Sequence, residues 1–242
     1  MWQEMKGLAK LPMSVKLAVT TFLLVAGLGY LLGFSNIYLT YNLVDSQPGL
    51  SIDDIRIAFN GSQDGSKLEK ALGGAMKQYL ESDQEGATLV TWIKGGHTEA
   101  TFKDAKVVFE NSCITCHSND VKTAGVSLEA YQDVLPLLAV DTGKSISRLV
   151  ELSHVHLMGA LPLVFLLCLV FSFTLFGEKL KGTIMVVSLL ALVFDVGSWW
   201  LAKAWGGLAF TVMAAGMTLA LAFLVLILLS LYDLWLRKDV AP

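Results

Sequence analysis

Four long apolar runs interrupt the chain and leave one sizeable polar segment between the first run and the second. The runs cover residues 17–34, 155–176, 184–202 and 208–231. Each is close to the ~20 residues that an α-helix needs to cross the hydrocarbon core of a bilayer. The last three runs are joined by short connections, which favour antiparallel neighbours. The pattern predicts four transmembrane helices and one domain outside the bilayer.

The first apolar run follows three basic residues, Lys6, Lys10 and Lys16. A cleaved secretory signal also starts with positive charge, but its apolar stretch is usually about 7–15 residues long and ends at a small-residue cleavage site. This run continues into Tyr38 and Tyr41 without a clear A-x-A sequence. We therefore expect a membrane helix that is not cleaved.

The polar segment, residues 35–152, has the spacing of several short helices. Ser51 followed closely by two acids is typical of a helix start, and apolar residues recur at helical spacing beyond it. No stretch alternates convincingly, so a small all-α domain is expected. The predicted helices begin after Ser51, lie around 68–80, 89–93, 102–110 and 127–137, and end with 143–153, which runs directly into the second membrane helix.

These predictions divide the chain into four parts and define an all-α fold class. Residues 1–34 are the N-terminal tail and the first membrane helix, and residues 35–152 are the external domain. Residues 153–236 hold the other three membrane helices, and residues 237–242 form a C-terminal tail.

Basic residues indicate the orientation, because loops in the cytoplasm carry an excess of Lys and Arg. With the N-terminus in the cytoplasm, the basic residues close to the membrane on the outside are mainly Lys144, Arg148 and Lys203. Those on the inside are Lys6, Lys10, Lys16, Lys179, Lys181, Arg237 and Lys238. We therefore expect a multi-pass protein of the bacterial inner membrane, with both termini cytoplasmic and the polar domain periplasmic.

The amino-acid composition agrees with a membrane protein and limits the kinds of molecule that it is expected to bind. The chain is 54% hydrophobic and only 16% charged, whereas soluble domains usually carry about 25% charged residues. Its formal net charge of -3 offers nucleic acid no electrostatic attraction. The sequence therefore predicts a membrane partner and no nucleic-acid partner.

Residues 113–117, Cys113-Ile-Thr-Cys116-His117, have the C-x-x-C-H spacing of covalent haem attachment. Thiols three positions apart can each bond one vinyl group of the same porphyrin, and the adjacent histidine then lies under the iron as its proximal ligand. A thioredoxin-type motif would need a βαβ context, and a zinc site would need a second ligand pair nearby; the sequence predicts neither. The motif therefore predicts one covalent haem c, held by Cys113, Cys116 and His117.

The sixth iron ligand is left open by the sequence. No Met or His lies between His117 and Ser153, so the nearest downstream candidates are His154 and His156, followed by Met158. Two positions apart on a helix, the two histidines point to nearly opposite faces, so both cannot ligate one iron. We expect His154 as the ligand with His156 as the alternative, and the competing role for either is a hydrogen bond at the membrane interface.

Three other residues of similar chemistry have simpler explanations. His97 follows a Gly-Gly turn and fits a solvated loop residue, and Met76 lies on an apolar helical face and fits core packing. Cys168 lies in the middle of an apolar run and is expected to be a small core residue.

Asp195 lies in the outward-facing half of the third apolar run, where a carboxyl needs a partner or a hydrated cavity. His156 and Lys203 are plausible partners at similar depth. One interpretation is a proton acceptor in a quinol pocket, and the other is a structural hydrogen bond to a neighbouring helix.

A chain of haems across the bilayer would need imidazoles on facing helices at two depths, whereas the only membrane histidines are His154 and His156. Electron transfer is therefore expected at or outside the external surface.

The segment from Ala105 to His117 resembles the haem segment of planctomycete-type cytochrome c domains, in which a short helix ends directly in the attachment motif. The arrangement of the chain is similar to a group of uncharacterised bacterial inner-membrane monohaem cytochromes. The features that this chain shares with the group are the N-terminal anchor, a helical segment like 68–76, the haem motif, and the sequence 153–159 that opens a helical bundle. The resemblance implies a membrane cytochrome with haem bound by Cys113, Cys116 and His117.

These observations predict an electron-transfer protein rather than an enzyme on its own, acting as a subunit or docking partner of a respiratory or related complex. The expected partners are a redox protein or a larger membrane complex. Two alternatives stay open: a subunit that oxidises quinol through Asp195 and an outer histidine, and a haem-bearing sensor or scaffold.

Overall fold

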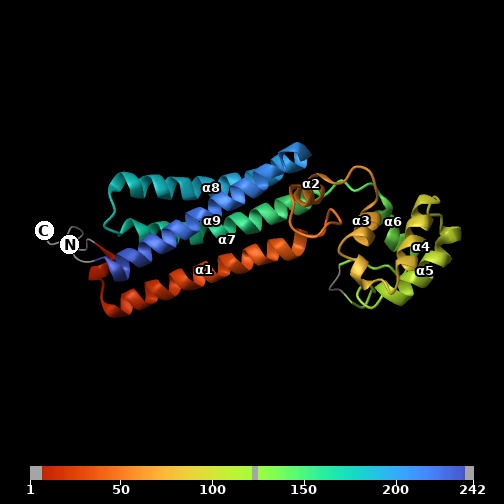
Figure 1. Ribbon diagram of the computed structural model, residues 1–242, viewed down its shortest axis with the longest axis horizontal. Helices are drawn as coiled ribbons and strands as arrows, with labels where there is room; N and C mark the ends of the chain where they lie inside the picture. Colours follow the sequence, from red (N-terminus) through yellow and green to blue (C-terminus); the bar gives the residue numbers. More distant parts are fainter. Residues whose placement is uncertain (1–6, 122–124, 238–242) are drawn as a thin grey trace. The chain divides into compact units, whose positions relative to one another are not determined.

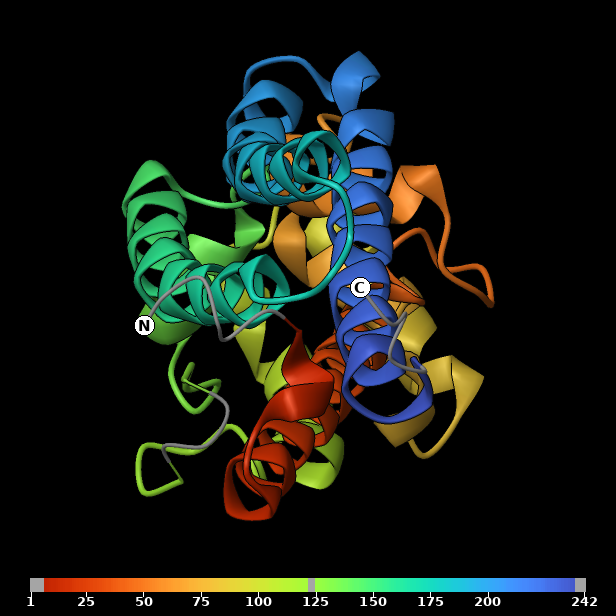
Figure 2. The same cartoon turned by 90° about the vertical axis from the view of Figure 1, so that its left-hand side faces the viewer.

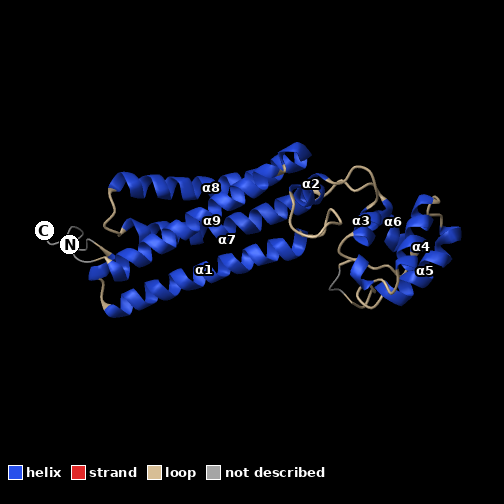
Figure 3. Ribbon diagram, viewed as in Figure 1, coloured by secondary structure: helices blue, strands red, loops and turns tan. Residues whose placement is uncertain are grey.

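The computed structural model describes residues 7–121 and 125–237. Within these ranges every regular element is helical, apart from an isolated β-bridge between Ser66 and Val140 (Figure 3). The all-α class is thereby confirmed. The chain forms two compact units, one made of residues 1–39 and 145–242 and the other of residues 40–144. Residues 1–6 and 238–242 of the predicted tails, with Lys6 and Lys238, fall outside the described residues.

Four helices of the first unit are long and apolar enough to cross a membrane, which confirms the predicted number of candidate spans. Along α1 the helix continues for 29 residues, or about 44 Å at 1.5 Å per residue. That length matches the roughly 40–45 Å of a bilayer with its headgroups. The four helices are α1 (Met13–Tyr41), α7 (Ile146–Ser172), α8 (Glu178–Ala204) and α9 (Phe210–Leu231) (Figure 1).

One apolar cluster holds these four helices together. Figure 2 looks along the bundle and shows the helices around their shared interior. Cys168 is buried in this cluster, as expected of a small core residue. The buried members include Leu23 and Ala26 of α1, Val164, Leu167 and Phe171 of α7, Ala191 and Leu192 of α8, and Leu219, Phe223 and Leu226 of α9.

A fully buried carboxylate, Asp233, connects three segments at one end of the bundle. It accepts hydrogen bonds from the backbone N–H groups of Leu8 and Leu175, each at 2.9 Å. The guanidinium of Arg237 lies 3.2 Å from the same carboxylate. Because a buried charge is tolerated only when it is paired and hydrogen-bonded, Asp233 fixes the N-terminal segment and the α7–α8 connection against the last helix.

The second unit consists of short helices, three of which begin at a serine whose side chain caps the first turn. The side chains of Ser51 and Ser66 each accept a hydrogen bond from the backbone N–H three residues later. The carboxylate of the acidic residue at that position in turn accepts from the backbone N–H of the serine. A second apolar cluster, built around Leu89, Trp92 and Phe109, forms the core of this unit. Its helices are α2 (Ile52–Asn60), α3 (Lys67–Gly73), α4 (Asp83–Lys94), α5 (Phe102–Val108) and α6 (Tyr131–Leu138).

Helix bounds depart from the expectation in three places. The helix expected over 68–80 ends at Gly73, because Gly74 has a non-helical backbone (φ −111°, ψ −122°); Gly74 also lies so close to the Leu43 carbonyl that a Cβ would fall 2.5 Å from its oxygen. The helix expected over 127–137 begins only at Tyr131, because Ala130 has an extended backbone and serves as the N-cap, with its N–H donating to the Asp133 carboxylate at 3.3 Å. The helix expected over 143–153 begins three residues later, at Ile146 after the N-cap Ser145, and it continues into the membrane span as α7, as expected.

Replacing Asp233 by Ala should lower the melting temperature of the detergent-solubilised protein by several degrees. The substitution leaves two backbone N–H groups without acceptors, at a cost of about 1–3 kcal/mol each if they stay buried. The matched control is Asp53→Ala, which removes an exposed ion pair with Arg56 and should change the melting temperature little. Equal melting temperatures for the two variants would contradict the role of Asp233.

Candidate functional site

One turn of backbone brings the three residues of the C-x-x-C-H motif together. Helix α5 continues into a single π-helical turn, Phe109–Cys113, that ends at the first cysteine. Beyond it, the N–H groups of Cys116 and His117 both donate to the carbonyl of Cys113, at 3.1 and 2.9 Å. Both thiols and the imidazole are therefore held within one turn.

The imidazole of His117 is oriented by the backbone. Its Nδ1 lies 3.1 Å from the carbonyl oxygen of Val126, and its own carbonyl accepts from the N–H of Leu128 at 2.9 Å. A carbonyl at Nδ1 favours the tautomer in which Nε2 carries the lone pair, and metal-binding histidines usually have this second partner. The arrangement is the one that an imidazole needs in order to ligate iron through Nε2.

The two cysteines differ in their surroundings. Cys113 is partly buried against the apolar core of the second unit, whereas Cys116 is exposed. Burial, together with the negative charge of Glu85, raises the pKa of the Cys113 thiol to about 11. In the polypeptide without haem, Cys113 is therefore a protonated thiol at neutral pH.

The core beside Cys113 contains a polar atom without a partner. The indole Nε1 of Trp92 is buried and makes no hydrogen bond within the described residues. The Trp92 ring packs in the same apolar cluster as Cys113 and lies at right angles to Phe109, with 6.4 Å between ring centroids. Buried donors are nearly always paired, so this indole is a donor available to an acceptor outside the described chain.

Among the candidates for a sixth ligand, His97 and Met76 lie in the same unit as the motif. His97 is half-buried rather than fully solvated, with Nδ1 3.2 Å from the carbonyl of Ile93. Its backbone has a positive φ of 40°, and its carbonyl accepts from the Tyr131 hydroxyl at 3.1 Å. The expectation that Met76 packs in the core is wrong, because its side chain is exposed, with 36% of its surface accessible, and it is not part of the apolar cluster of this unit.

The downstream candidates lie on α7, in the membrane unit. His154 and Met158 are exposed, whereas His156 is only partly exposed. His156 Nε2 lies 3.2 Å from Asp195 Oδ2, and its ring meets Trp199 edge-on. The atom Nε2 is buried and forms no directed hydrogen bond within the described residues, so its contact with Asp195 is a close approach without hydrogen-bond geometry.

Asp195 is buried on α8, and two residues not identified by the sequence analysis contribute to its surroundings. Gly216 of α9 leaves space beside it, since an added Cβ would lie 3.6 Å from Asp195 Oδ1. The hydroxyl of Tyr30 on α1 donates to the Gly216 carbonyl at 3.2 Å. The one available signal for Tyr30 was a hydroxyl in the middle of an apolar run.

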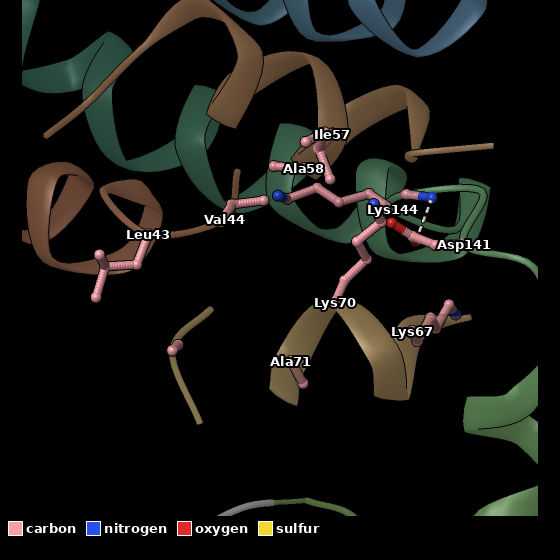
Figure 4. A pocket seen from close by; sticks show the side chains of 11 residues that line it. Leu43, Val44, Ile57, Ala58, Lys67, Lys70, Ala71, Asp141 and Lys144 are labelled. Atoms are coloured by element: carbon pink, nitrogen blue, oxygen red, sulfur yellow. Dashed lines mark hydrogen bonds between the residues drawn. The ribbon is translucent and has the colours of Figure 1, made fainter. Parts of the chain in front are cut away.

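A separate cavity of about 330 Å³ lies in the second unit (Figure 4). None of its lining residues belongs to the C-x-x-C-H motif. Its walls are mostly apolar and include three lysines, Lys67, Lys70 and Lys144, with one carboxylate, Asp141.

Fold and sites together define a multi-pass helical membrane protein with a helical domain between its first and second membrane spans. Residues 140–241 match the model of the Aq_1264_TM family, described as a transmembrane helical domain. This region covers α7, α8 and α9 and does not include residues 113–117. No curated protein matches the chain, and no solved structure does.

In protein produced without haem, Cys113 should react with iodoacetamide far more slowly than Cys116 at pH 8. The thiolate is the reactive form, and the raised pKa keeps Cys113 protonated until the pH approaches 11. Because an unfolded chain releases this proton at lower pH than the folded chain, the contribution of Cys113 to stability falls as the pH rises from about 9 to 11. Peptide mass spectrometry of a pH series measures both rates, and equal rates at pH 8 would contradict the burial of Cys113.

Proposed function

We propose that this protein is a membrane-anchored c-type cytochrome that transfers electrons on the periplasmic side of the bacterial inner membrane. When bound, haem c supplies a reversible one-electron couple at its iron. Cys113 and Cys116 would hold the haem covalently, and His117 would ligate the iron. The protein would act as a subunit or docking partner of a respiratory or related electron-transport complex.

The observation that carries this proposal is the contact of His117 Nδ1 with the Val126 carbonyl at 3.1 Å. The motif alone supplies the residue types, whereas this contact leaves Nε2 as the ligating atom. Cys113 and Cys116 lie on the same turn, as attachment to two vinyl groups of one porphyrin requires. The unpartnered indole N–H of Trp92 is a further donor in this core, and haem propionates are acceptors of the kind it lacks.

Periplasmic placement of the second unit rests on the excess of basic residues assigned to the cytoplasmic side. It also suits the chemistry, because c-type attachment takes place outside the cytoplasm. The sixth ligand stays a prediction: His154 is the first choice and His156 the alternative. The contact of His156 Nε2 with Asp195 favours His154 of the two.

The test is haem staining of a denaturing gel, after expression in a bacterium that has c-type maturation enzymes. Wild-type protein should retain a peroxidase-active band, because thioether bonds survive denaturation. The double variant Cys113→Ala/Cys116→Ala should lose the band completely. The control Cys168→Ala alters only a buried residue of the membrane unit and should keep the band. A wild-type protein without covalent haem would refute the proposal.

A second candidate function, quinol oxidation, is favoured by the 3.2 Å contact between His156 and Asp195. Ionisable residues inside a membrane are costly and are often part of a functional site. Here a hydroquinone would give up two protons and two electrons to become the quinone. The pair would accept the protons, and the electrons would pass singly to ferric haem, which an external redox protein reoxidises.

Quinol oxidation predicts that a short-tailed benzoquinol reduces the haem in proteoliposomes and that Asp195→Asn slows this reduction at least tenfold. The amide keeps the size of the carboxylate but cannot take up a proton. Ser188→Ala, which removes a buried hydroxyl from the same helix, is the matched control and should keep the wild-type rate. Both proteins should be fully reduced by dithionite. An unchanged rate in Asp195→Asn would exclude this candidate function.

A further inference from the structure

The cavity in the second unit has the features of a site for an amphiphilic anion. It has a volume of about 330 Å³, and its apolar walls come from Leu43, Val44, Ile57 and Ala71, among others. Figure 4 shows the side chain of Lys70 extending from α3 toward that of Lys144. The cavity therefore combines an apolar surface with the positive charges of lysine side chains from two different segments.

The charge of the lining is positive. Its single carboxylate, Asp141, accepts hydrogen bonds from two backbone N–H groups, that of Gly143 in its own loop at 2.9 Å and that of Ser62, just beyond α2, at 3.3 Å. Lys70 has an exposed partner, Asp64, at 3.3 Å. Lys144 has no carboxylate within ion-pair distance in the described part of the chain, so the lining keeps positive charge in excess.

Lys144 is held in place by aromatic rings. Its ammonium lies 4.6 Å from the ring centroid of Tyr41 and 4.4 Å from that of Phe59. Such cation–π contacts fix the position of the charge without neutralising it. The backbone is fixed as well, because Gly143 lies so close to the Phe59 carbonyl that a Cβ would fall 2.4 Å from its oxygen. Lys144 is therefore a prepositioned positive charge.

The position of the cavity along the chain indicates where an anion would come from. Leu43 and Val44 follow the last residue of α1, Tyr41, and Lys144 precedes the first residue of α7, Ile146. Three residues of chain reach about 10 Å at most. Because α1 matches the thickness of a bilayer with its headgroups, these walls lie within reach of the lipid phosphates.

We propose that this cavity binds an anionic phospholipid, with the phosphate between Lys70 and Lys144 and apolar lipid atoms against the apolar wall. Lysine-rich pockets beside membrane helices are suited to such headgroups. The excess positive charge selects an anionic over a zwitterionic lipid. Lipid binding does not depend on the haem, so it can succeed or fail separately from the proposed electron transfer.

The test is native mass spectrometry of the full-length protein with added lipid. Phosphatidylglycerol should be retained at least tenfold better than phosphatidylcholine of the same chain length. Lys70→Gln/Lys144→Gln should weaken phosphatidylglycerol binding roughly 25-fold, at about fivefold for each lysine. The matched control Lys94→Gln/Lys103→Gln removes two exposed lysines of the same unit that do not line the cavity, and it should change binding less than twofold.

One further variant and one competition measurement complete the test. Lys144→Arg retains the charge over the rings and should retain binding, which separates loss of charge from loss of folding. Inorganic phosphate at millimolar concentration should compete poorly, because it lacks the apolar part. Equal retention of the two lipids, equal loss in both lysine pairs, or displacement by free phosphate would each overturn the proposal.

Discussion

Hydrocarbon cannot hydrogen-bond a polypeptide backbone, and this constraint determines the architecture of the membrane unit. Each span must satisfy its own N–H and C=O groups, so the four apolar runs are helices from end to end. The few polar groups that remain inside the bundle must find partners in one another or in the backbone. Asp233 finds two N–H groups and a guanidinium, and Asp195 lies against His156. Segments far apart in the sequence are brought together at these points.

The second unit follows a different rule, because its helices are too short to span a bilayer and a small apolar core must hold them together. Its helices are short, three of them begin at serine caps, and α3, α4, α5 and α6 pack around a core that contains Trp92 and Phe109. That core is built immediately beside the C-x-x-C-H turn, so the position of Cys113 is determined by apolar packing as much as by the motif. The proposed haem would therefore lie against a preformed apolar surface, where the reduction potential depends on burial as well as on ligands.

Much of this could be predicted from the sequence, because the relevant signals are local. The four spans follow from the lengths of the apolar runs, and the start of α2 follows from Ser51 and the acids after it. The end of α3 at Gly73 was missed, although two consecutive glycines are a local signal for the end of a helix. The contact between His156 and Asp195 could be expected only as a possibility, because it depends on how α7 and α8 are rotated. Tyr30 on α1 and Gly216 on α9 were missed because their contact likewise depends on how the helices of the bundle pack together.

The most direct measurement of the central claim is mass spectrometry of the tryptic peptide that carries Cys113 and Cys116, from protein matured in the periplasm. Covalent attachment predicts a peptide heavier by one haem, with both thiols blocked to alkylation. A peptide of unmodified mass, in which iodoacetamide labels both cysteines, would contradict the assignment of this protein as a c-type cytochrome.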